Sequence, residues 1–318
     1  MESLLKVEGL SKNFGLKAGF LGRTKHWVKA VQDVHLEIAP GETLGLVGES
    51  GSGKSTLARL ILRLIEPTGG RVHFDGVELT GLSHQEMTKH RAGIQMIFQD
   101  PLDSLNARWS IEQIIAEPLE INGWSKEKRR ARVEELLSIV GLDKAALDRF
   151  PHEFSGGQRQ RIGIARALAL SPKLILADEP VSALDVSIQA QILNLLKDLQ
   201  DQFGLSFLFI AHDIHVIRFI SHRIAVMYMG RIVELGSSEA IGSGPKHPYT
   251  RALMASVPEA QVGAQEFQPI EGEIPSLIDP PPGCPFHPRC ALAQTECKAQ
   301  VPELLQKAEG HWAACPIV

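Results

Sequence analysis

The chain has 318 residues, of which 44% are hydrophobic and 22% are charged, and its formal net charge is −4. This length and apolar content suffice for a sizeable buried core, arranged as one large domain with an appendage or as two domains. The slight acidic excess gives no sign of the basic surface that nucleic-acid binders carry, so we expect no nucleic-acid partner. The first residues, MESLLKVEGL, lack the apolar core of a signal peptide, and no stretch approaches the roughly 18 apolar residues of a membrane span. We therefore expect any membrane role to depend on partner chains.

The first part of the chain has the pattern of strands followed by a helix. Residues 4–10 and 28–38 alternate β-branched and polar side chains, which predicts strands, and we expect a loop over residues 16–27. The apolar run 43–48 is typical of a fully buried strand. It continues directly into a Gly/Ser loop and then into a helical pattern. The sequence therefore predicts a strand–loop–helix unit here.

The rest of the chain indicates an α/β fold. Residues 70–79 predict a hairpin, and the stretch 105–170 is mostly helical. Buried strands are predicted at 173–178 and 205–211, with a helix between them, which implies a parallel sheet. Residues 222–236 predict a second hairpin.

After residue 236 the composition changes, and proline becomes frequent. We therefore expect a first domain over residues 1–236, with a helical subdomain at about 100–170, and a small appended domain over residues 237–318. All four cysteines lie in this appended part. A secreted disulfide scaffold would spread its cysteines through the chain, so we infer a reducing compartment with one local cysteine site.

A phosphate-binding loop is predicted at residues 48–56, GESGSGKST. The pattern Gly48-x4-Gly53-Lys54-Ser55 follows a buried strand and opens a helix, which is the context that this motif requires. The glycines let backbone N–H groups surround the phosphates, and the helix N-terminus adds partial positive charge. Lys54 would bridge the β- and γ-phosphates of ATP, and Ser55 would ligate Mg²⁺. The residues expected to contact the nucleotide are Gly48, Ser50, Gly51, Gly53, Lys54, Ser55 and Thr56.

A pair of acids ends the buried strand at 173–178. Ligands of open α/β sheets bind at the carboxyl ends of the strands, so Asp178 would hold Mg²⁺, directly or through water. Glu179 would polarise the water that attacks the γ-phosphate. Two adjacent acids after a strand are weak evidence alone, and the upstream phosphate loop is what gives them weight.

The stretch FSGGQRQRIGIARAL, residues 154–168, resembles the signature sequence of ABC ATPases. In purely structural terms, Ser155 caps a helix after a glycine turn. The motif is accompanied, however, by the phosphate loop, by Gln99 in IFQDP, by SALD at 182–185 and by His212 in AHD. All of these stand in the order of an ABC ATP-binding domain from about residue 4 to 236.

This resemblance implies a P-loop NTPase (RecA-like) core with an antiparallel β subdomain and an α-helical signature subdomain, here followed by the small Cys-rich extension. It implies that Phe14 stacks on adenine, although the family usually has Tyr there and core packing is the alternative. It implies that Gln99 reaches Mg²⁺ and the attacking water, and that His212 hydrogen-bonds the γ-phosphate. Asp185 would lie at a dimer interface.

The resemblance also implies a head-to-tail pair of ATPase domains, in which two bound ATP molecules hold the halves together until hydrolysis. The signature of one chain would then cap the nucleotide that its partner binds. The signature residues expected at this nucleotide are Ser155, Gly156, Gly157 and Gln158.

The segments KHPYTRALMASVP (246–258) and GCPFHPRC (283–290) resemble the tail of oligopeptide/dipeptide importer ATPases, a family that also serves nickel, glutathione and other small peptides. Residues 95–119 and the 16–27 segment resemble its F-type subunit. The implied partners are a sister ATPase, two transmembrane permeases and an extracytoplasmic peptide-binding protein. The implied location is the cytoplasmic face of the inner membrane, as a peripheral subunit.

The four cysteines follow the spacing Cys284-x5-Cys290-x6-Cys297-x17-Cys315. Four thiolates suit a [4Fe–4S] cluster or a tetrahedral zinc ion, and the spacing matches neither of their common patterns. The importer family is associated with an iron–sulfur cluster at this position. Zinc, inert thiols and disulfides are the alternatives.

Three other functions share parts of the pattern. A nucleic-acid-associated ABC ATPase of DNA repair or translation would generally carry two cassettes or large insertions. An exporter or another kind of importer would lack the HPYT and Cys-rich tail. A regulatory pseudo-ATPase is disfavoured because Lys54, Glu179 and His212 are all present.

Overall fold

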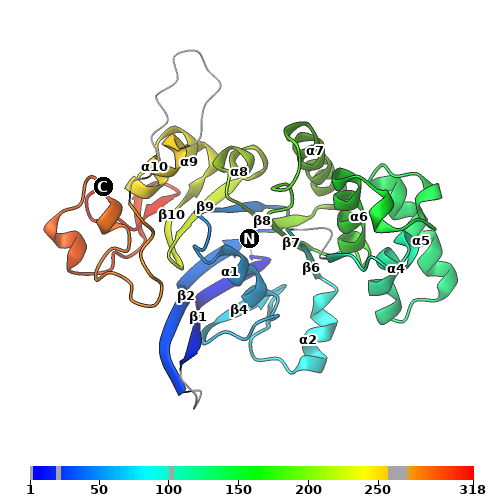
Figure 1. The fold of residues 1–318 in the computed structure, drawn as a ribbon, viewed down its shortest axis with the longest axis horizontal. Helices are drawn as coiled ribbons and strands as arrows, with labels where there is room; N and C mark the ends of the chain where they lie inside the picture. The colour runs from blue at the N-terminus through cyan, green and yellow to red at the C-terminus, as the bar shows by residue number, and fades with distance from the viewer. Residues whose placement is uncertain (1–2, 19–22, 100–103, 257–269, 271) are drawn as a thin grey trace. The chain divides into compact units, whose positions relative to one another are not determined.

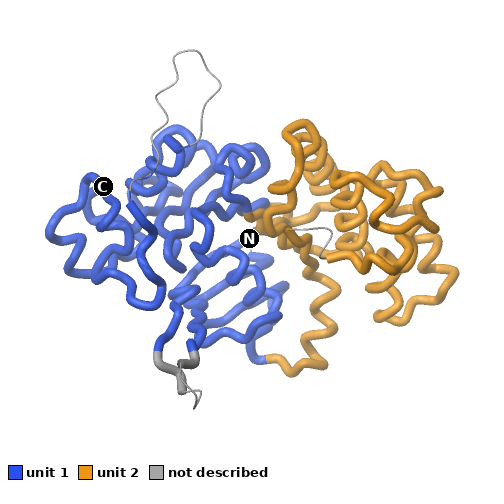
Figure 2. The backbone as a smooth tube through the Cα atoms, in the orientation of Figure 1, with its two compact units in different colours: residues 1–39, 43–81, 211–318 blue, residues 40–42, 82–210 orange. Residues whose placement is uncertain are grey.

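A computed structural model describes residues 3–18, 23–99, 104–256, 270 and 272–318. The chain divides into two compact units, which Figure 2 shows in blue and orange. Unit 1 draws on residues 1–39, 43–81 and 211–318, and unit 2 draws on residues 40–42 and 82–210. Each unit therefore combines segments that are far apart in the sequence.

The first sheet of unit 1 has four antiparallel strands in the order β2-β1-β4-β5 (Figure 1). They are β1 (Leu5–Ala18), β2 (Arg23–Ile38), β4 (Gly69–Phe74) and β5 (Val77–Glu78). β4 and β5 form the hairpin that the sequence predicts. Its two turn residues, Asp75 and Gly76, have φ values of 51° and 78°, as a tight two-residue hairpin turn requires.

The loop predicted over residues 16–27 is wrong at both ends of that segment. β1 continues to Ala18 and β2 already begins at Arg23, so Leu16 pairs with His26 across a long hairpin. Residues 19–22 lie outside the described residues. Glycine, and lysine to a lesser degree, disfavours strands, but the preference amounts to about 1 kcal/mol at most, and pairing with a neighbouring strand overrides it here.

A second set of strands in unit 1 has the order β11-β12-β10-β9-β3. β3 is parallel to β9, and the other neighbours are antiparallel. These strands are β3 (Thr43–Val47), β9 (Arg223–Tyr228), β10 (Arg231–Ser237), β11 (Leu305–Ala308) and β12 (His311–Ala313). β3 is buried at every position, as its unbroken apolar run predicts. The helices and 3-10 turns of unit 1 are α1 (Lys54–Ile61), α8 (Ile214–Ile220), α9 (Ser238–Ser243), α10 (Pro248–Ala255), η3 (His287–Arg289) and η4 (Thr295–Lys298).

A buried carboxylate joins the C-terminal segments to this sheet. Glu234 on β10 has no exposed surface, and its oxygens accept hydrogen bonds from the backbone N–H groups of Lys246 at 2.6 Å and His247 at 2.9 Å. Nε2 of His311 on β12 lies 2.6 Å from the same carboxylate. Because a buried charge is costly unless it is hydrogen-bonded, these three partners fix the α10 segment and β12 against β10.

Unit 2 contains three parallel strands in the order β8-β7-β6, as the strand–helix–strand pattern predicts. They are β6 (Ile94–Ile97), β7 (Leu174–Asp178) and β8 (Ser206–Ala211). The mostly helical stretch is also confirmed, and Ser110 and Ser155 form capping boxes at two of its helices. The helices and 3-10 turns described in unit 2 are α2 (His84–Arg91), α4 (Ile111–Ile121), α5 (Lys126–Ile139), η1 (Lys144–Ala146), η2 (Pro151–Glu153), α6 (Gly156–Leu168) and α7 (Val186–Phe203).

Candidate functional site

The phosphate loop of unit 1 connects β3 to α1 and depends on glycine. Gly53 has a φ of 106°, which L side chains rarely adopt, and a Cβ there would come within 2.3 Å of the Ala30 carbonyl oxygen. A Cβ on Gly48 would lie 2.1 Å from the carbonyl oxygen of Met227. The loop can therefore take this path only with glycine at both positions. Ser50 and Gly51 are exposed, while Ser55 and Thr56 are half-buried in the first turn of α1.

Lys54 lies inside this loop and is 5% exposed. Its ammonium donates to the carbonyl oxygens of Gly48 at 2.7 Å and Glu49 at 3.0 Å, and lies 3.4 Å from the hydroxyl of Ser52. A buried ammonium needs such acceptors, and here the loop backbone supplies them. The positive charge is therefore held where a phosphate group entering the loop would meet it.

The acidic end of β7 is the centre of the predicted site in unit 2. Asp178 is 3% exposed and is the last residue of that strand. Glu179 has a φ of 48°, an unusual backbone conformation for this residue type, and its N–H donates to Ile210 of the neighbouring β8 at 2.9 Å. The amide of Gln99 donates to the Glu179 carboxylate at 2.8 Å. The structure thus brings together two predicted site residues that are 80 positions apart.

The signature begins α6 in the way that its structural reading predicts. The Ser155 hydroxyl accepts from the Gln158 N–H at 3.3 Å, and the Gln158 side chain accepts from the Ser155 N–H at 3.0 Å. Ser155, Gly156 and Gln158 are exposed, and Gly157 is buried. A Cβ on Gly157 would lie 2.5 Å from Cγ2 of Ile188 on α7, so this glycine allows the two helices to approach closely. Asp185, the N-cap residue of α7, is exposed.

Two further predicted residues belong to unit 1. Phe14 on β1 is 36% exposed, and the Lys12 ammonium lies 5.2 Å from the centre of its ring. His212 directly follows β8 and is exposed. The next residue, Asp213, caps α8 by accepting from the His215 N–H at 2.7 Å. The roles expected for Phe14 and His212 stay predictions.

A second set of residues, which no sequence motif predicts, surrounds the phosphate loop. The Arg289 guanidinium donates to both carboxylate oxygens of Glu49, at 2.7 and 3.0 Å. This contact raises the pKa of Arg289 above its ordinary value. The Tyr249 hydroxyl accepts from the Glu49 N–H at 2.8 Å. An acidic side chain inside a phosphate-binding loop was the one signal in the sequence that pointed to a neutralising partner.

The four cysteines are all free thiols, and Cys290 is the one that is not buried. Burial first, and then the charges of the other three cysteines, raise the pKa of Cys284 to about 11. The Cys284 N–H donates to the Cys297 carbonyl oxygen at 2.8 Å, so these two residues are direct neighbours. Among the described residues, however, no group of three or more His, Cys, Asp or Glu side chains has the arrangement of a metal site. The cluster predicted here is therefore not supported by the structure.

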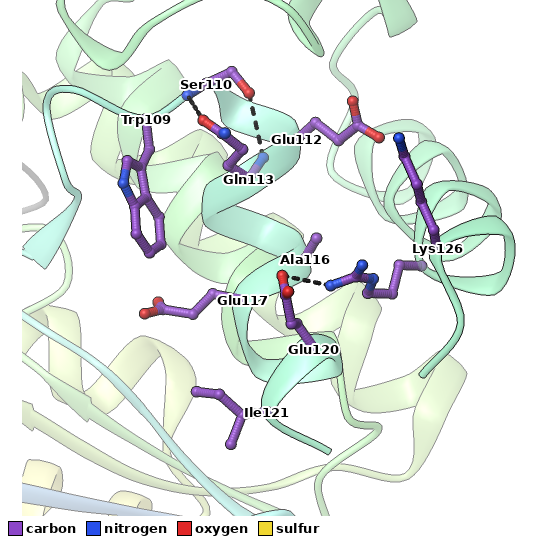
Figure 3. Close-up of a pocket in the computed structure, with 10 residues that line it drawn as sticks. Trp109, Ser110, Glu112, Gln113, Ala116, Glu117, Glu120, Ile121 and Lys126 are labelled. Atoms are coloured by element: carbon purple, nitrogen blue, oxygen red, sulfur yellow. Dashed lines mark hydrogen bonds and ion pairs between the residues drawn. The ribbon is translucent and has the colours of Figure 1, made fainter. Parts of the chain in front are cut away.

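A groove of about 680 Å³ opens on the helical part of unit 2 (Figure 3). Apolar side chains line part of it, and two of them are well exposed, Trp109 at 36% and Ile121 at 71%. Glu112, Glu117 and Glu120 also line it, from the same helix α4. Glu120 forms an ion pair with Arg129 at the groove wall.

Within the described part of the chain, no helix has the length and apolar character of a membrane span.

The close approach of α6 and α7 at Gly157 should make this glycine important for stability, and Gly163 in the same helix provides a control. We expect Gly157→Ala to lower the free energy of unfolding by about 1–3 kcal/mol, because the Ile188 side chain is β-branched and cannot easily move aside. A Cβ on Gly163 would meet no atom within 4 Å, so Gly163→Ala should stabilise the protein by about 0.5–1 kcal/mol. Urea unfolding followed by circular dichroism measures both. Equal effects of the two substitutions would contradict this account of Gly157.

Comparison with known proteins assigns the two parts of the chain. Residues 31–182 match the ABC transporter family, and residues 233–297 match the C-terminal region of oligopeptide/dipeptide transporters. The chain is 51% identical to a probable peptide ABC transporter ATP-binding protein, y4tS, of Sinorhizobium fredii, over 99% of this chain and 90% of the relative. It is 49% identical to the oligopeptide transport ATP-binding protein AppF of Bacillus subtilis, over 99% and 97% of the two chains. It is also 49% identical to OppF of Salmonella typhimurium, over 98% and 95%.

Solved structures agree with these matches. The ATP-binding cassette MJ0796, determined as a dimer bound to ADP and Pi, superposes with a TM-score of 0.65 at 34% identity. It covers 74% of this chain and 98% of its own. The cassette cbiO1 of Clostridium perfringens gives a TM-score of 0.66 at 27% identity, over 77% and 92% of the two chains. The ABC cassette fold is thus shown, and the chain belongs to the ABC transporter ATP-binding proteins of the oligopeptide/dipeptide family.

Proposed function

We propose that this chain is the ATP-hydrolysing subunit that energises an ABC importer of oligopeptides or dipeptides. The observation that carries the proposal is that two catalytic features are present: a glycine loop in which Lys54 is buried, and a carboxylate at the end of a strand, Glu179, which accepts a hydrogen bond from Gln99. The relatives that match the full length of the chain are named as peptide transport ATP-binding proteins. Nickel, glutathione or another small peptide is the alternative cargo for the same motor.

The nucleotide would be bound mainly by the phosphate loop. Its N–H groups and Lys54 would hold the phosphates, and Phe14 would stack on adenine. Ser55, Gln99 and Asp178 would hold Mg²⁺; the donor set fits, since it supplies the oxygen ligands that this ion prefers. When bound, the ion neutralises charge that develops on the phosphate oxygens. The other loop residues proposed at the nucleotide are Gly48, Ser50, Gly51, Gly53 and Thr56.

Glu179 would activate the attacking water. Its carboxylate already accepts from Gln99, and its strained backbone is anchored to β8, so the oxygen that accepts the proton is fixed in direction. His212 would hydrogen-bond the γ-phosphate and hold it for in-line attack. The proton of the water passes to Glu179 as the new P–O bond forms and ADP leaves.

We expect Glu179→Gln to reduce steady-state ATP turnover by about 10²–10⁴-fold, because the amide cannot accept the proton, while ATP still binds. Phosphate release and equilibrium binding of a fluorescent ATP analogue measure the two effects separately. Glu135→Gln is the matched control, since Glu135 is an exposed acid on α5 of the same unit. Undiminished turnover in the Glu179 variant would refute the proposed role.

We propose further that two ATPase chains of this type pair head to tail. The exposed start of α6 presents backbone N–H groups at a helix N-terminus, which suits an anionic phosphate of the partner's nucleotide. Asp185 would lie at the same interface, and the related MJ0796 cassette was solved as a dimer. The partner would be a sister ATPase, this chain being the F-type subunit. The signature residues placed at the partner's nucleotide are Ser155, Gly156, Gly157 and Gln158.

The groove that α4 lines, described above, is the surface that we assign to a permease. Exposed apolar side chains gathered in a hollow indicate a protein-binding site, and Trp109 and Ile121 provide them. Two of the three glutamates of α4, Glu112 and Glu120, are already paired with Arg130 and Arg129, so the apolar side chains carry this assignment. Two permeases, with an extracytoplasmic peptide-binding protein beyond them, would place this chain at the cytoplasmic face of the inner membrane.

Co-purification from detergent-solubilised membranes tests the partners. A tagged chain should bring down two polytopic permeases and a second ATPase, and Ile121→Glu should lower their yield several-fold by placing a charge in the groove. Phe203→Glu is the control, because Phe203 is a 42% exposed aromatic on α7 that does not line the groove. Ribosomal or DNA-associated partners without permeases would overturn the transport function.

We also propose that residues 237–318, which pack within unit 1, form an extension built around a metal centre, a [4Fe–4S] cluster held by Cys284, Cys290, Cys297 and Cys315. The chain supplies four free thiols, most of them buried, and a cluster of this kind requires four thiolate ligands. Their present arrangement does not have ligating geometry, so binding would draw them closer. Hydrolysis uses no redox group, so the centre would cross-link the extension.

Anaerobic purification tests this centre. We expect about four iron atoms per chain and the broad visible absorption of an iron–sulfur cluster, both lost in Cys297→Ser. Thiol titration and metal analysis on the same sample complete the measurement. If the sample contains one zinc ion per chain and no iron, the centre is a zinc site and not a cluster. If it contains neither metal and four titratable thiols, there is no metal centre.

A further inference from the structure

The C-terminal extension places a cation on the phosphate loop itself. Glu49 directly follows Gly48 in that loop, and its carboxylate is 21% exposed. The Arg289 side chain, from η3 in the Cys-rich segment, is 4% exposed and contacts both carboxylate oxygens, at 2.7 and 3.0 Å. This is the bidentate geometry in which arginine binds a carboxylate most specifically.

Neighbouring groups hold Arg289 in this position. Its guanidinium lies 3.4 Å from the Tyr228 hydroxyl and 3.4 Å from the carbonyl oxygen of Ile270. Below it, the rings of Tyr228, Tyr249 and Phe286 pack with centroid distances of 4.6 to 5.4 Å. These three rings come from β9, α10 and the segment just before η3. The cation is therefore placed by packing and not by a single flexible contact.

Glu49 is held at three points at once. Its N–H donates to the Tyr249 hydroxyl at 2.8 Å, its carbonyl oxygen accepts from Lys54 at 3.0 Å, and its carboxylate binds Arg289. Two of these partners belong to the C-terminal extension, and the third is the lysine expected to contact the phosphates. All of them lie in unit 1.

The electrostatic consequence follows from what the loop has to bind. ATP brings several negative charges to the loop, and a carboxylate within the loop opposes them. Partial burial reduces screening by salt, so this opposition is larger than it would be on an open surface. Arg289 offsets the Glu49 charge in direct contact, at 2.7 and 3.0 Å.

We propose that Arg289 is a positioning residue for ATP binding, which neutralises Glu49 so that the phosphate loop can accept a polyphosphate. The inference rests on the proposed function, because it assumes that ATP is what the loop binds. It makes the C-terminal extension a part of the nucleotide site.

Four variants of the full chain distinguish this neutralising role from a purely structural one. Equilibrium binding of a fluorescent ATP analogue is measured for Arg289→Met, Glu49→Gln, the double variant and Arg289→Lys. We expect Arg289→Met to weaken binding by about tenfold, as one uncompensated charge at a partly buried site would. Glu49→Gln should bind at least as tightly as the wild type, and the double variant should regain wild-type affinity. Arg289→Lys keeps the charge and should stay within a few-fold of the wild type.

The control is Arg251→Met, which removes the same charge from the same extension, where Arg251 donates to the Pro245 carbonyl oxygen at 2.8 Å. It should bind ATP as the wild type does. The loss of ATP affinity in Arg289→Met should also become smaller as the salt concentration is raised. If Arg289 made only a structural contact, salt would not change that loss. Melting temperatures without nucleotide show whether each variant is folded. If Arg289→Met is not folded, Arg289→Gln replaces it, because glutamine still donates a hydrogen bond to Glu49 but lacks the charge, and the same loss of affinity is expected.

Two outcomes would overturn the inference: wild-type affinity in Arg289→Met, or a double variant as weak as Arg289→Met alone. In both cases the wild-type chain binds ATP, and the proposed function stands. A wild-type chain that binds no ATP would contradict the proposed function itself.

Discussion

A loop that binds a polyphosphate has to present N–H groups and positive charge in a space too narrow for side chains. In this chain, glycine at 48 and 53 removes the side chains, and the buried Lys54 ammonium provides the charge. The loop carbonyl oxygens hold that ammonium before any phosphate arrives. Everything else around the loop, including the acid at position 49 and the residues that contact it, has to be compatible with this requirement.

Much of the fold is local enough to be predicted. The buried strand β3, the glycine loop and α1 follow one another within 20 residues, and each has its own pattern of residues. The hairpin turn at Asp75 and Gly76 depends on two adjacent residues with positive φ. The outer part of the long β1–β2 hairpin was missed for the opposite reason: it is stabilised by pairing between strands, and its glycine and lysine residues conceal the strand-favouring Thr24 and Trp27.

The site divides in the same way. Asp178, Glu179 and the signature are recognised from short motifs, but the left-handed backbone of Glu179 and its contact with Gln99 result from the packing of β7 against its neighbours. The partners of Glu234 lie 12, 13 and 77 residues away from it, so no local pattern predicts that contact. The arginine on Glu49 is 240 residues from it. Such contacts depend on the tertiary fold, which a motif does not describe.

The Arg289–Glu49 contact has a consequence for how such proteins can be modified or recombined. A cassette separated from its extension would keep an acid in its nucleotide loop and lose the residue that makes the acid harmless. An extension fused to a cassette with a neutral residue at position 49 would bring a nearly buried arginine without a counter-ion. The two parts are therefore interchangeable only as a matched set, and the residue after the first loop glycine is the one to check before chimaeras are built.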